Sequence, residues 1–190
     1  MLRTCVGYAG GTTRSPTYED LGDHTETLQV EFDPTVIGYE RLLAVFWAAH
    51  TPTAAPWSTQ YKAAVFTHGP EQARLARATR EAAAARLGAP VRTEVLPFTG
   101  FTPAEDYHQK YALRHRPDLM RHLARAYGQG AALDAALIRS TAAARLNGWI
   151  GSKGDLAALE RELPEVGLPP ALAEQLLRDL RGRAGPVGCR

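Results

Sequence analysis

Strand patterns and helix patterns alternate along this chain up to about residue 115, and only helix patterns follow. Residues 25–32 alternate apolar and polar side chains, as a strand with one buried face does. Residues 39–47 repeat apolar side chains at helical spacing instead, and residues 60–68 and 91–98 again have the composition of strands. Helices that connect successive strands are typical of α/β proteins. We therefore expect an α/β fold with a mixed sheet and flanking helices.

Glycine and proline mark further boundaries within this part of the chain. Residues 2–6 predict a first strand, and the glycines of the following Gly-Tyr-Ala-Gly-Gly stretch permit a tight turn. Gly69 and Pro70 open a helix rich in alanine and arginine, which ends near Gly88. The segment 102–116 predicts another helix, because a threonine and a proline stand at its cap and first helical position.

The last third of the chain carries helical patterns only. Helices are expected at 117–127, 133–146, 155–163 and 170–180. Because none of the chemistry-bearing motifs falls in this part, we expect a first domain over residues 1–128. Residues 129–190 would then form a separable helical extension.

Composition restricts the class of protein more than its function. The 190 residues include 45% hydrophobic ones, which is enough for a real core, and the net charge of +2 argues against a dedicated nucleic-acid binder. No apolar run approaches the roughly 20 residues of a membrane helix. The two cysteines, Cys5 and Cys189, stand too far apart in sequence to indicate a disulfide framework, so a reducing, cytoplasmic compartment is expected.

Five short motifs occur in one order at regular intervals. They are "GYAGG" with "SPTY", "HTE" at the start of a strand, "VFWAAH", "STQY" and "PAEDYHQKY". Together they resemble the peptide methionine sulfoxide reductase A family, over roughly residues 2–116. Each motif alone is weak, and their shared order makes the resemblance specific.

The resemblance implies a thiol chemistry without metal or cofactor. Such enzymes reduce the S-sulfoxide of methionine, free or in proteins, and so repair proteins under oxidative stress. A cysteine thiolate attacks the sulfoxide sulfur, methionine leaves, and a sulfenic acid remains. A second thiol then forms a disulfide, which thioredoxin reduces. Hydrogen-bond donors at the sulfoxide oxygen stabilise the charge that develops there.

Three residues of this chain match the polar groups of the family site. Glu26 matches the acid that delivers a proton, a role that needs partial desolvation of the carboxyl group. Tyr18 and Tyr61 match the tyrosines that bind the sulfoxide oxygen. Without the motif context, Glu26 would be interpreted as an exposed strand carboxylate and either tyrosine as part of the core.

The chain also departs from the family pattern. The nucleophile of the family lies in a Gly-Cys-Phe-Trp motif upstream of the glycine turn, and neither this motif nor its strand and helix is present. We expect this to leave a sheet edge and an apolar face uncovered, and to favour self-association. The family also has an acid where this chain has Pro56. The neighbouring Trp57 either supplies an aromatic wall or simply fills space.

Neither cysteine has an unambiguous role. Cys5 lies close to the expected nucleophile position, but a strand residue there is better interpreted as a small buried filler. Cys189 lies in a glycine-rich end, where relatives carry resolving cysteines, and it is equally well an incidental exposed thiol. His108, His115 and His122 repeat every seven residues, and we interpret them as structural or solvated rather than as metal ligands.

Two alternatives to a working reductase stay open. The chain could be a non-catalytic homologue that binds sulfoxides or a protein partner through Glu26, Tyr18 and Tyr61, or it could be an incomplete chain whose start lies upstream. In either case we expect little or no reduction of methionine-S-sulfoxide by the chain alone, because polarisation without a positioned thiolate gives no turnover.

Overall fold

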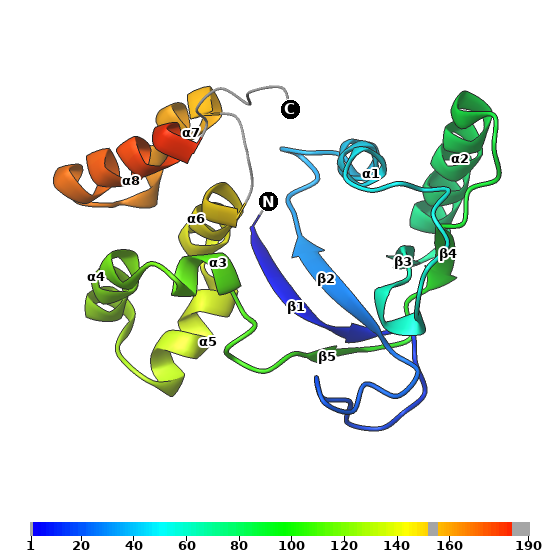
Figure 1. The fold of residues 1–190 in the computed structure, drawn as a ribbon, viewed down its shortest axis with the longest axis horizontal. Coiled ribbons are helices and arrows are strands. Elements are labelled where there is room, and N and C mark those ends of the chain that lie inside the picture. Colours follow the sequence, from blue (N-terminus) through cyan, green and yellow to red (C-terminus); the bar gives the residue numbers. More distant parts are fainter. Residues whose placement is uncertain (1, 152–155, 184–190) are drawn as a thin grey trace. The chain divides into compact units, whose positions relative to one another are not determined.

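The computed structural model describes residues 2–151 and 156–183, and these form two compact units. The first, here called the α/β unit, spans Cys5–Glu105. The second, here called the helical unit, begins at Asp106 and includes Leu2–Thr4. Figure 1 shows strands together with helices in the first unit and helices in the second. The α/β class expected from the sequence is confirmed.

One sheet of the α/β unit is built on the first strand. Strands β1 (Arg3–Ala9), β2 (Thr25–Glu31) and β5 (Phe101–Pro103) lie in the order β2-β1-β5 (Figure 1). β1 and β5 are antiparallel, with Tyr8 opposite Thr102. β1 is the central strand of this sheet, so the residues that follow it are held close to both neighbouring strands.

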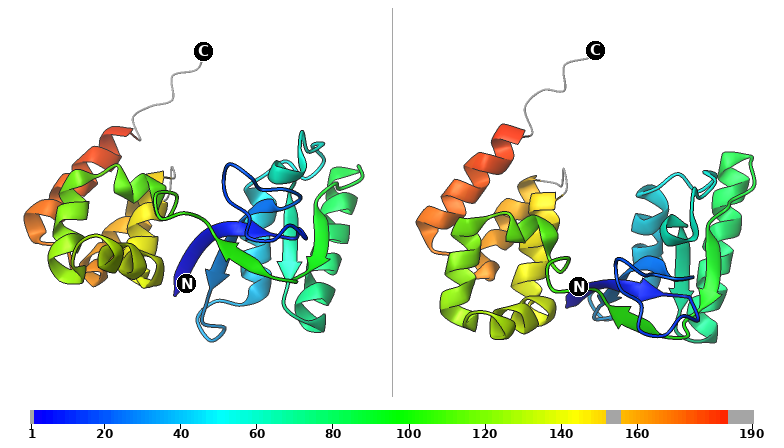
Figure 2. Two further views of the ribbon diagram at one scale, coloured as in Figure 1. Left: turned by 90° about the horizontal axis from the view of Figure 1, so that it is seen from below. Right: turned by 60° about the horizontal axis from the view of Figure 1, so that its bottom comes forward.

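The second sheet of this unit is a parallel pair. β3 (Ala64–Thr67) and β4 (Glu94–Pro97) are joined by helix α2 (Pro70–Leu87), and helix α1 (Tyr39–Ala48) precedes them (Figure 2). A parallel pair requires such a crossover connection. α2 ends where the sequence predicts, because Gly88 adopts the left-handed conformation, with φ of 60°. The single mixed sheet that was expected is thus divided into an antiparallel and a parallel part.

The core of the α/β unit consists of two separate clusters. α1 and α2 contribute most of the larger one, which contains Leu43, Trp47, Ala76, Ala83 and Val91. The buried faces of α1 therefore agree with the apolar stripe in its sequence. The smaller cluster contains Tyr8, Leu21 and Ala104.

Strand β2 does not bury the face that its sequence suggests. Leu28 is 58% exposed, whereas Thr25 on the opposite face is 3% exposed. Alternation in a strand shows that two faces differ, but the elements that pack against the strand decide which face is covered. Leu28 and Glu26 thus share an open face of β2, and the self-association expected from an uncovered apolar face stays a prediction.

The prediction of a helix over residues 102–116 is wrong. Its first residues belong to β5, and only the short helix α3 (Tyr111–Arg114) forms near its end. The backbone N–H of Ala104 donates to the carbonyl oxygen of Val6 at 3.0 Å, which extends the pairing with β1. Long-range strand pairing therefore overrides the local signal of a capped helix start.

The helical unit follows the predicted helices with one change. Its elements are α4 (Pro117–Tyr127), α5 (Ala131–Arg139), α6 (Thr141–Gly151), α7 (Leu156–Glu162), η2 (Leu163–Val166) and α8 (Pro170–Arg183). The helix expected at 133–146 is two helices, separated at Ser140. The Ser140 hydroxyl accepts a hydrogen bond from the backbone N–H of Ala143 at 3.0 Å, as a helix N-cap does.

A single buried cluster holds the helical unit together. It contains Leu113, Leu119, Leu123, Leu137, Ala143, Leu146, Ile150, Leu159, Leu163, Leu176 and Leu180. The border expected after residue 128 lies between α4 and α5, inside this cluster. The apolar residues beyond the border therefore pack with those before it, because α4 alone has no second apolar surface to cover its stripe. Among the described residues, no helix is long and apolar enough to cross a membrane.

Candidate functional site

The three polar residues expected at the site lie together in the α/β unit. Glu26 is the second residue of β2, and Tyr61 ends the 3-10 turn η1 (Thr59–Tyr61). The Thr25 hydroxyl donates to the carbonyl oxygen of Thr59 at 3.0 Å, which fixes this turn against the start of β2. Glu26 and Gln60, which directly follow Thr25 and Thr59 in the sequence, are thereby brought next to each other.

Gln60 bridges the acid and the tyrosine. Its Nε2 group donates to Glu26 Oε1 at 2.7 Å and to the Tyr61 hydroxyl oxygen at 3.0 Å. Sequence reasoning treated Gln60 only as part of the "STQY" motif. Its position directly before Tyr61 in that motif was the available signal. The hydrogen bond from Gln60 orients the Glu26 carboxylate, and Glu26 is otherwise exposed.

Tyr18 completes the group. Partial desolvation raises the pKa of the Tyr61 hydroxyl, and the negative charge of Glu26 and interactions with Tyr18, including hydrogen bonds, raise it further. A raised pKa keeps the phenol protonated, and therefore able to donate a hydrogen bond, over a wider range of pH. Tyr18 and Tyr61 are 44% and 41% exposed. Both side chains are thus accessible rather than part of the core.

The backbone of Tyr18 is held by Glu105, a residue that sequence reasoning did not single out. Glu105 Oε1 accepts the backbone N–H of Tyr18 at 2.9 Å, and Oε2 accepts the hydroxyl of Tyr8 at 2.7 Å. Tyr8 is only 2% exposed. Glu105 belongs to the "PAEDYHQKY" motif, and that membership was the available signal. A buried tyrosine and a site loop are therefore positioned by one carboxylate.

The loop between β1 and β2 is closed by Asp23. Its carboxylate accepts the backbone N–H of Thr12 and Thr13 at 2.8–3.0 Å and both of their hydroxyls at 2.9 Å. These hydrogen bonds, led by those from the backbone of Thr13 and Thr12, hold the pKa of Asp23 well below its usual range. The loop that carries Tyr18 is thus tied to the residues just before β2.

His24 reinforces this closure. The backbone N–H of Gly11 donates to His24 Nδ1 at 3.3 Å, so Nε2 carries the ring proton and donates to the carbonyl oxygen of Thr13 at 2.9 Å. His24 is 8% exposed. The histidine of the "HTE" motif therefore has a structural role, and the chemistry expected of Glu26, two residues further along, stays a prediction.

Two glycines of the first motif are required for different reasons. Gly10 has a φ of 80°, and a Cβ atom there would lie 2.5 Å from the ring of Phe66. Gly7 lies inside β1, where a Cβ atom would collide with the carbonyl oxygen of Thr102 on β5. Only Gly10 is therefore needed for its left-handed backbone, whereas Gly7 is needed for close strand approach.

The structure gives less support to the expected roles of the two cysteines than to the grouping of the polar residues. Cys5 lies within β1, is partly buried, and its Sγ atom lies 3.6 Å from the carbonyl oxygen of Val6. Cys189 lies outside the described residues. The roles suggested for both thiols stay predictions. No three histidine, cysteine or carboxylate side chains of residues 2–151 and 156–183 gather in a way that could hold a metal ion.

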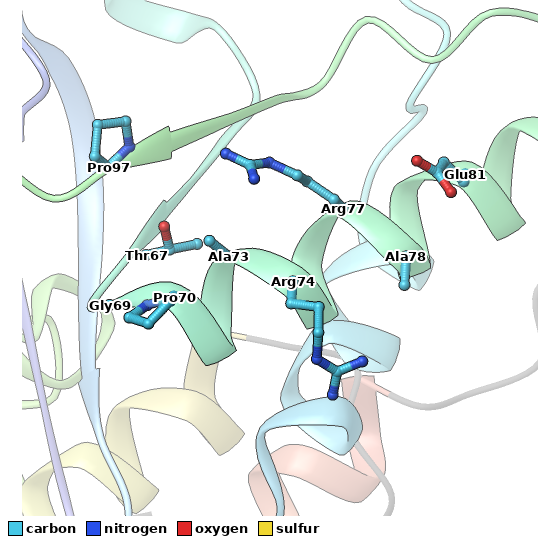
Figure 3. A pocket seen from close by; sticks show the side chains of 9 residues that line it. All are labelled: Thr67, Gly69, Pro70, Ala73, Arg74, Arg77, Ala78, Glu81 and Pro97. Carbon is cyan, nitrogen blue, oxygen red and sulfur yellow. The ribbon is translucent and has the colours of Figure 1, made fainter.

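A groove of about 630 Å³ lies elsewhere, along α2 and the end of β4 (Figure 3). Its lining comprises Thr67, Gly69, Pro70, Ala73, Arg74, Arg77, Ala78, Glu81 and Pro97. Arg74 is paired with Glu71 at 2.7 Å on the exposed helix surface. None of the polar residues expected at the site lines this groove, so the groove gives no support to a sulfoxide chemistry.

The comparisons agree with the motifs. A family model described as "Peptide methionine sulfoxide reductase" matches residues 1–136. The chain belongs to this family. The crystal structure of reduced Mxr1 from Saccharomyces cerevisiae is similar to it, with a TM-score of 0.56 and 28% identity. That similarity covers 60% of this chain and 71% of the yeast chain.

Sequence similarity to curated members of this family extends over more than half of this chain. A peptide methionine sulfoxide reductase of Drosophila melanogaster is 37% identical over 173 residues, covering 90% of this chain and 67% of the relative. The A5 protein of Oryza sativa is 39% identical over 155 residues, covering 78% of this chain and 59% of the relative. MsrA of Streptomyces griseus is 46% identical over 123 residues, covering 57% of this chain and 55% of the relative. The chain thus spans little more than half the length of several relatives that it matches.

Proposed function

We propose that this protein takes part in the reduction of methionine-S-sulfoxide, free or in proteins, to methionine. The observation that carries the proposal is the group formed by Tyr18, Glu26 and Tyr61, in which Gln60 bridges Glu26 and Tyr61. A sulfoxide oxygen accepts hydrogen bonds, and an exposed cluster of two phenols and a carboxyl group offers donors for it. The family membership and the names of the relatives support the same reaction.

In the proposed reaction the two tyrosines donate to the sulfoxide oxygen, and Glu26, when protonated, adds a proton to it. A cysteine thiolate attacks the sulfoxide sulfur and forms an S–S bond to it. The protonated oxygen then passes from the methionine sulfur to the cysteine sulfur as the S–O bond and the new S–S bond break, so that methionine leaves and the cysteine is left as a sulfenic acid. A second thiol attacks that sulfenic acid, so that a disulfide forms and water leaves. A dithiol then reduces the disulfide. Donors of this kind each lower the barrier by about 3–4 kcal/mol in comparable oxyanion sites.

The thiol is the less supported half of the proposal. Within the described residues, Cys5 is the only cysteine, and its partial burial in β1 favours a filler role over a nucleophile. This observation supports a second candidate function, in which the protein binds methionine sulfoxide without turning it over. Both candidates use the same polar group, so binding and turnover need separate measurements.

The decisive experiment measures both. Reduction of methionine-S-sulfoxide with dithiothreitol is followed for the wild-type chain, for Cys5→Ser, Cys189→Ser and Glu26→Gln, and for the double variant that lacks both cysteines. Turnover that Glu26→Gln lowers at least a hundredfold, and that one cysteine substitution abolishes, supports the reductase. Binding of the S-sulfoxide without turnover supports the second candidate. Turnover that survives removal of both cysteines contradicts the thiol mechanism.

The partners follow from the same chemistry. We propose thioredoxin or another dithiol as reductant, and no bound cofactor or metal, because thiols alone balance the reaction. A reductant of this kind acts in reducing compartments, and with only two cysteines in 190 residues we propose a cytoplasmic location. A Cys189→Ser variant that keeps the single turnover but loses the thioredoxin-driven reaction would support a resolving role for Cys189.

A further inference from the structure

Trp57 contacts the polar group, by which we mean Tyr18, Glu26 and Tyr61. Its side chain is 80% exposed. Its ring stacks on that of Tyr61, with centroids 4.5 Å apart and planes inclined by 19°. The indole therefore covers part of a candidate residue and still presents most of its own surface to water. A tryptophan that served only to fill space would be buried.

The segment that carries Trp57 is anchored on both sides. Before it, Pro52 is buried, and its carbonyl oxygen accepts the backbone N–H of Arg92 at 2.8 Å. After it, Thr59 is held by the hydroxyl of Thr25. The intervening residues 54–57 are exposed. The indole is thus displayed by a short span between two fixed points, which limits the conformational entropy that a ligand contact would remove.

A sulfoxide needs two kinds of contact. Its oxygen requires hydrogen-bond donors, and its two carbon substituents, a methyl and a methylene group, gain by contact with an apolar surface. We propose that Trp57 is the apolar wall that contacts the carbon substituents of a bound methionine sulfoxide, while Tyr18, Glu26 and Tyr61 hold its oxygen. This assignment rests on the proposed function.

Trp57 and the polar group should contribute to ligand binding in different ways. The wall contacts carbon atoms that methionine and methionine sulfoxide share, so it strengthens the binding of both. The polar group contacts the oxygen, which only the sulfoxide has. Trp57 should therefore set how tightly a methionine side chain is bound, and Glu26 should set how strongly the sulfoxide is preferred over the thioether.

The test uses two blocked ligands, N-acetyl-methionine-S-sulfoxide methylamide and N-acetyl-methionine methylamide. Their dissociation constants are measured by NMR titration of the wild-type chain and its variants, which needs no turnover. Trp57→Ala should weaken both ligands by about threefold to tenfold, the range expected for one or two methylene contacts. Trp57→Phe, which keeps an aromatic face, should restore much of the loss. Glu26→Gln should weaken the sulfoxide alone.

Val36→Ala is the matched control, because Val36 is 76% exposed and forms no part of the polar group. It should leave both dissociation constants unchanged. If the wild-type chain prefers the sulfoxide and Trp57→Ala binds both ligands like wild type, the wall is wrong and the proposed function stands. If Trp57→Ala weakens only the sulfoxide, the indole acts through the polar group, which also overturns the assignment. If the wild-type chain does not prefer the sulfoxide, the proposed function itself fails.

Discussion

The two units of this chain use their apolar residues in different ways. The helical unit gathers its leucines into one cluster, in which Leu113, Leu119, Leu137, Leu146 and Leu176 are each 0% exposed. The α/β unit has two smaller clusters. It also carries most of the large apolar residues that stay exposed, which are Tyr18, Leu28, Val36, Val45, Trp57, Tyr61 and Leu87.

This contrast indicates where stability and where binding reside. Fully buried leucines contribute to folding and have no surface left for a ligand. Tyr18, Tyr61 and Trp57 contribute little to a core and lie at the candidate site, where an exposed aromatic surface is useful. Residues at the candidate site should therefore tolerate substitution well in folding and poorly in binding, whereas residues of the helical cluster should show the reverse.

Truncation after Tyr127 should have the largest effect. It removes α5 to α8 and leaves Leu113, Leu119 and Leu123 without the residues that cover them. We expect the remaining part of the helical unit to lose its cooperative structure and the protein to aggregate, as measured by circular dichroism melts and light scattering. A soluble truncated protein with a sharp melt and an intact α4 would show that residues 129–190 are separable, as the sequence suggested.

A pair of leucine substitutions compares the units directly. Leu146→Ala should lower the free energy of unfolding by about 3 kcal/mol, because it leaves a cavity in the helical cluster. Leu28→Ala should change it by less than about 0.5 kcal/mol, because Leu28 is 58% exposed. Urea unfolding followed separately at Trp149 and Trp47 distinguishes the units. Equal effects of the two substitutions would remove the contrast.

Glu105→Gln should loosen the site loop more than the fold. The amide keeps the shape of the side chain but weakens the charge-assisted hydrogen bonds from Tyr8 and from the backbone of Tyr18. We expect a loss of stability of about 1–2 kcal/mol in the α/β unit and faster hydrogen exchange at the Tyr18 amide. An unchanged exchange rate at Tyr18 would show that Glu105 does not hold the loop. Glu19→Gln, on the exposed side of the same loop, is the control.

The smallest effect should appear only in acid. The pKa of Asp23 is lowered in the folded state, so its contribution to stability is complete above about pH 4, the ordinary range of the unfolded group, and is lost as the pH falls further. Asp23→Asn should therefore flatten the decline of α/β-unit stability between about pH 4 and pH 2, measured by urea unfolding at Trp47.

The helical unit provides the comparison for this pH effect. Arg116 holds the pKa of Asp118 below its usual range, so this unit has its own source of acid sensitivity. Asp23→Asn should leave the decline reported by Trp149 unchanged. A flattening of both declines would mean that the two units unfold as one, and would contradict the view of separate stabilities.

Local sequence signals determined where several helices begin and end, and short motifs supplied the candidates for the polar group. The apolar spacing of α1, the Gly69-Pro70 start and Gly88 end of α2, and the proline at the start of α4 all act within a few residues. Tyr18, Glu26 and Tyr61 were identified from short motifs in a fixed order. Such features are visible in a sequence because their causes lie within one turn of chain or one motif.

Only the tertiary structure decided which surfaces those elements cover. A threonine and a proline that suit a helix start became part of β5 because β1 offered backbone partners about 95 residues away in sequence. Leu28 stayed exposed because the elements described pack on other surfaces. Gln60 and Glu105 gained their roles from neighbours distant in sequence. Long-range pairing and packing leave no periodic trace in the residues concerned, so the sequence alone could not reveal them.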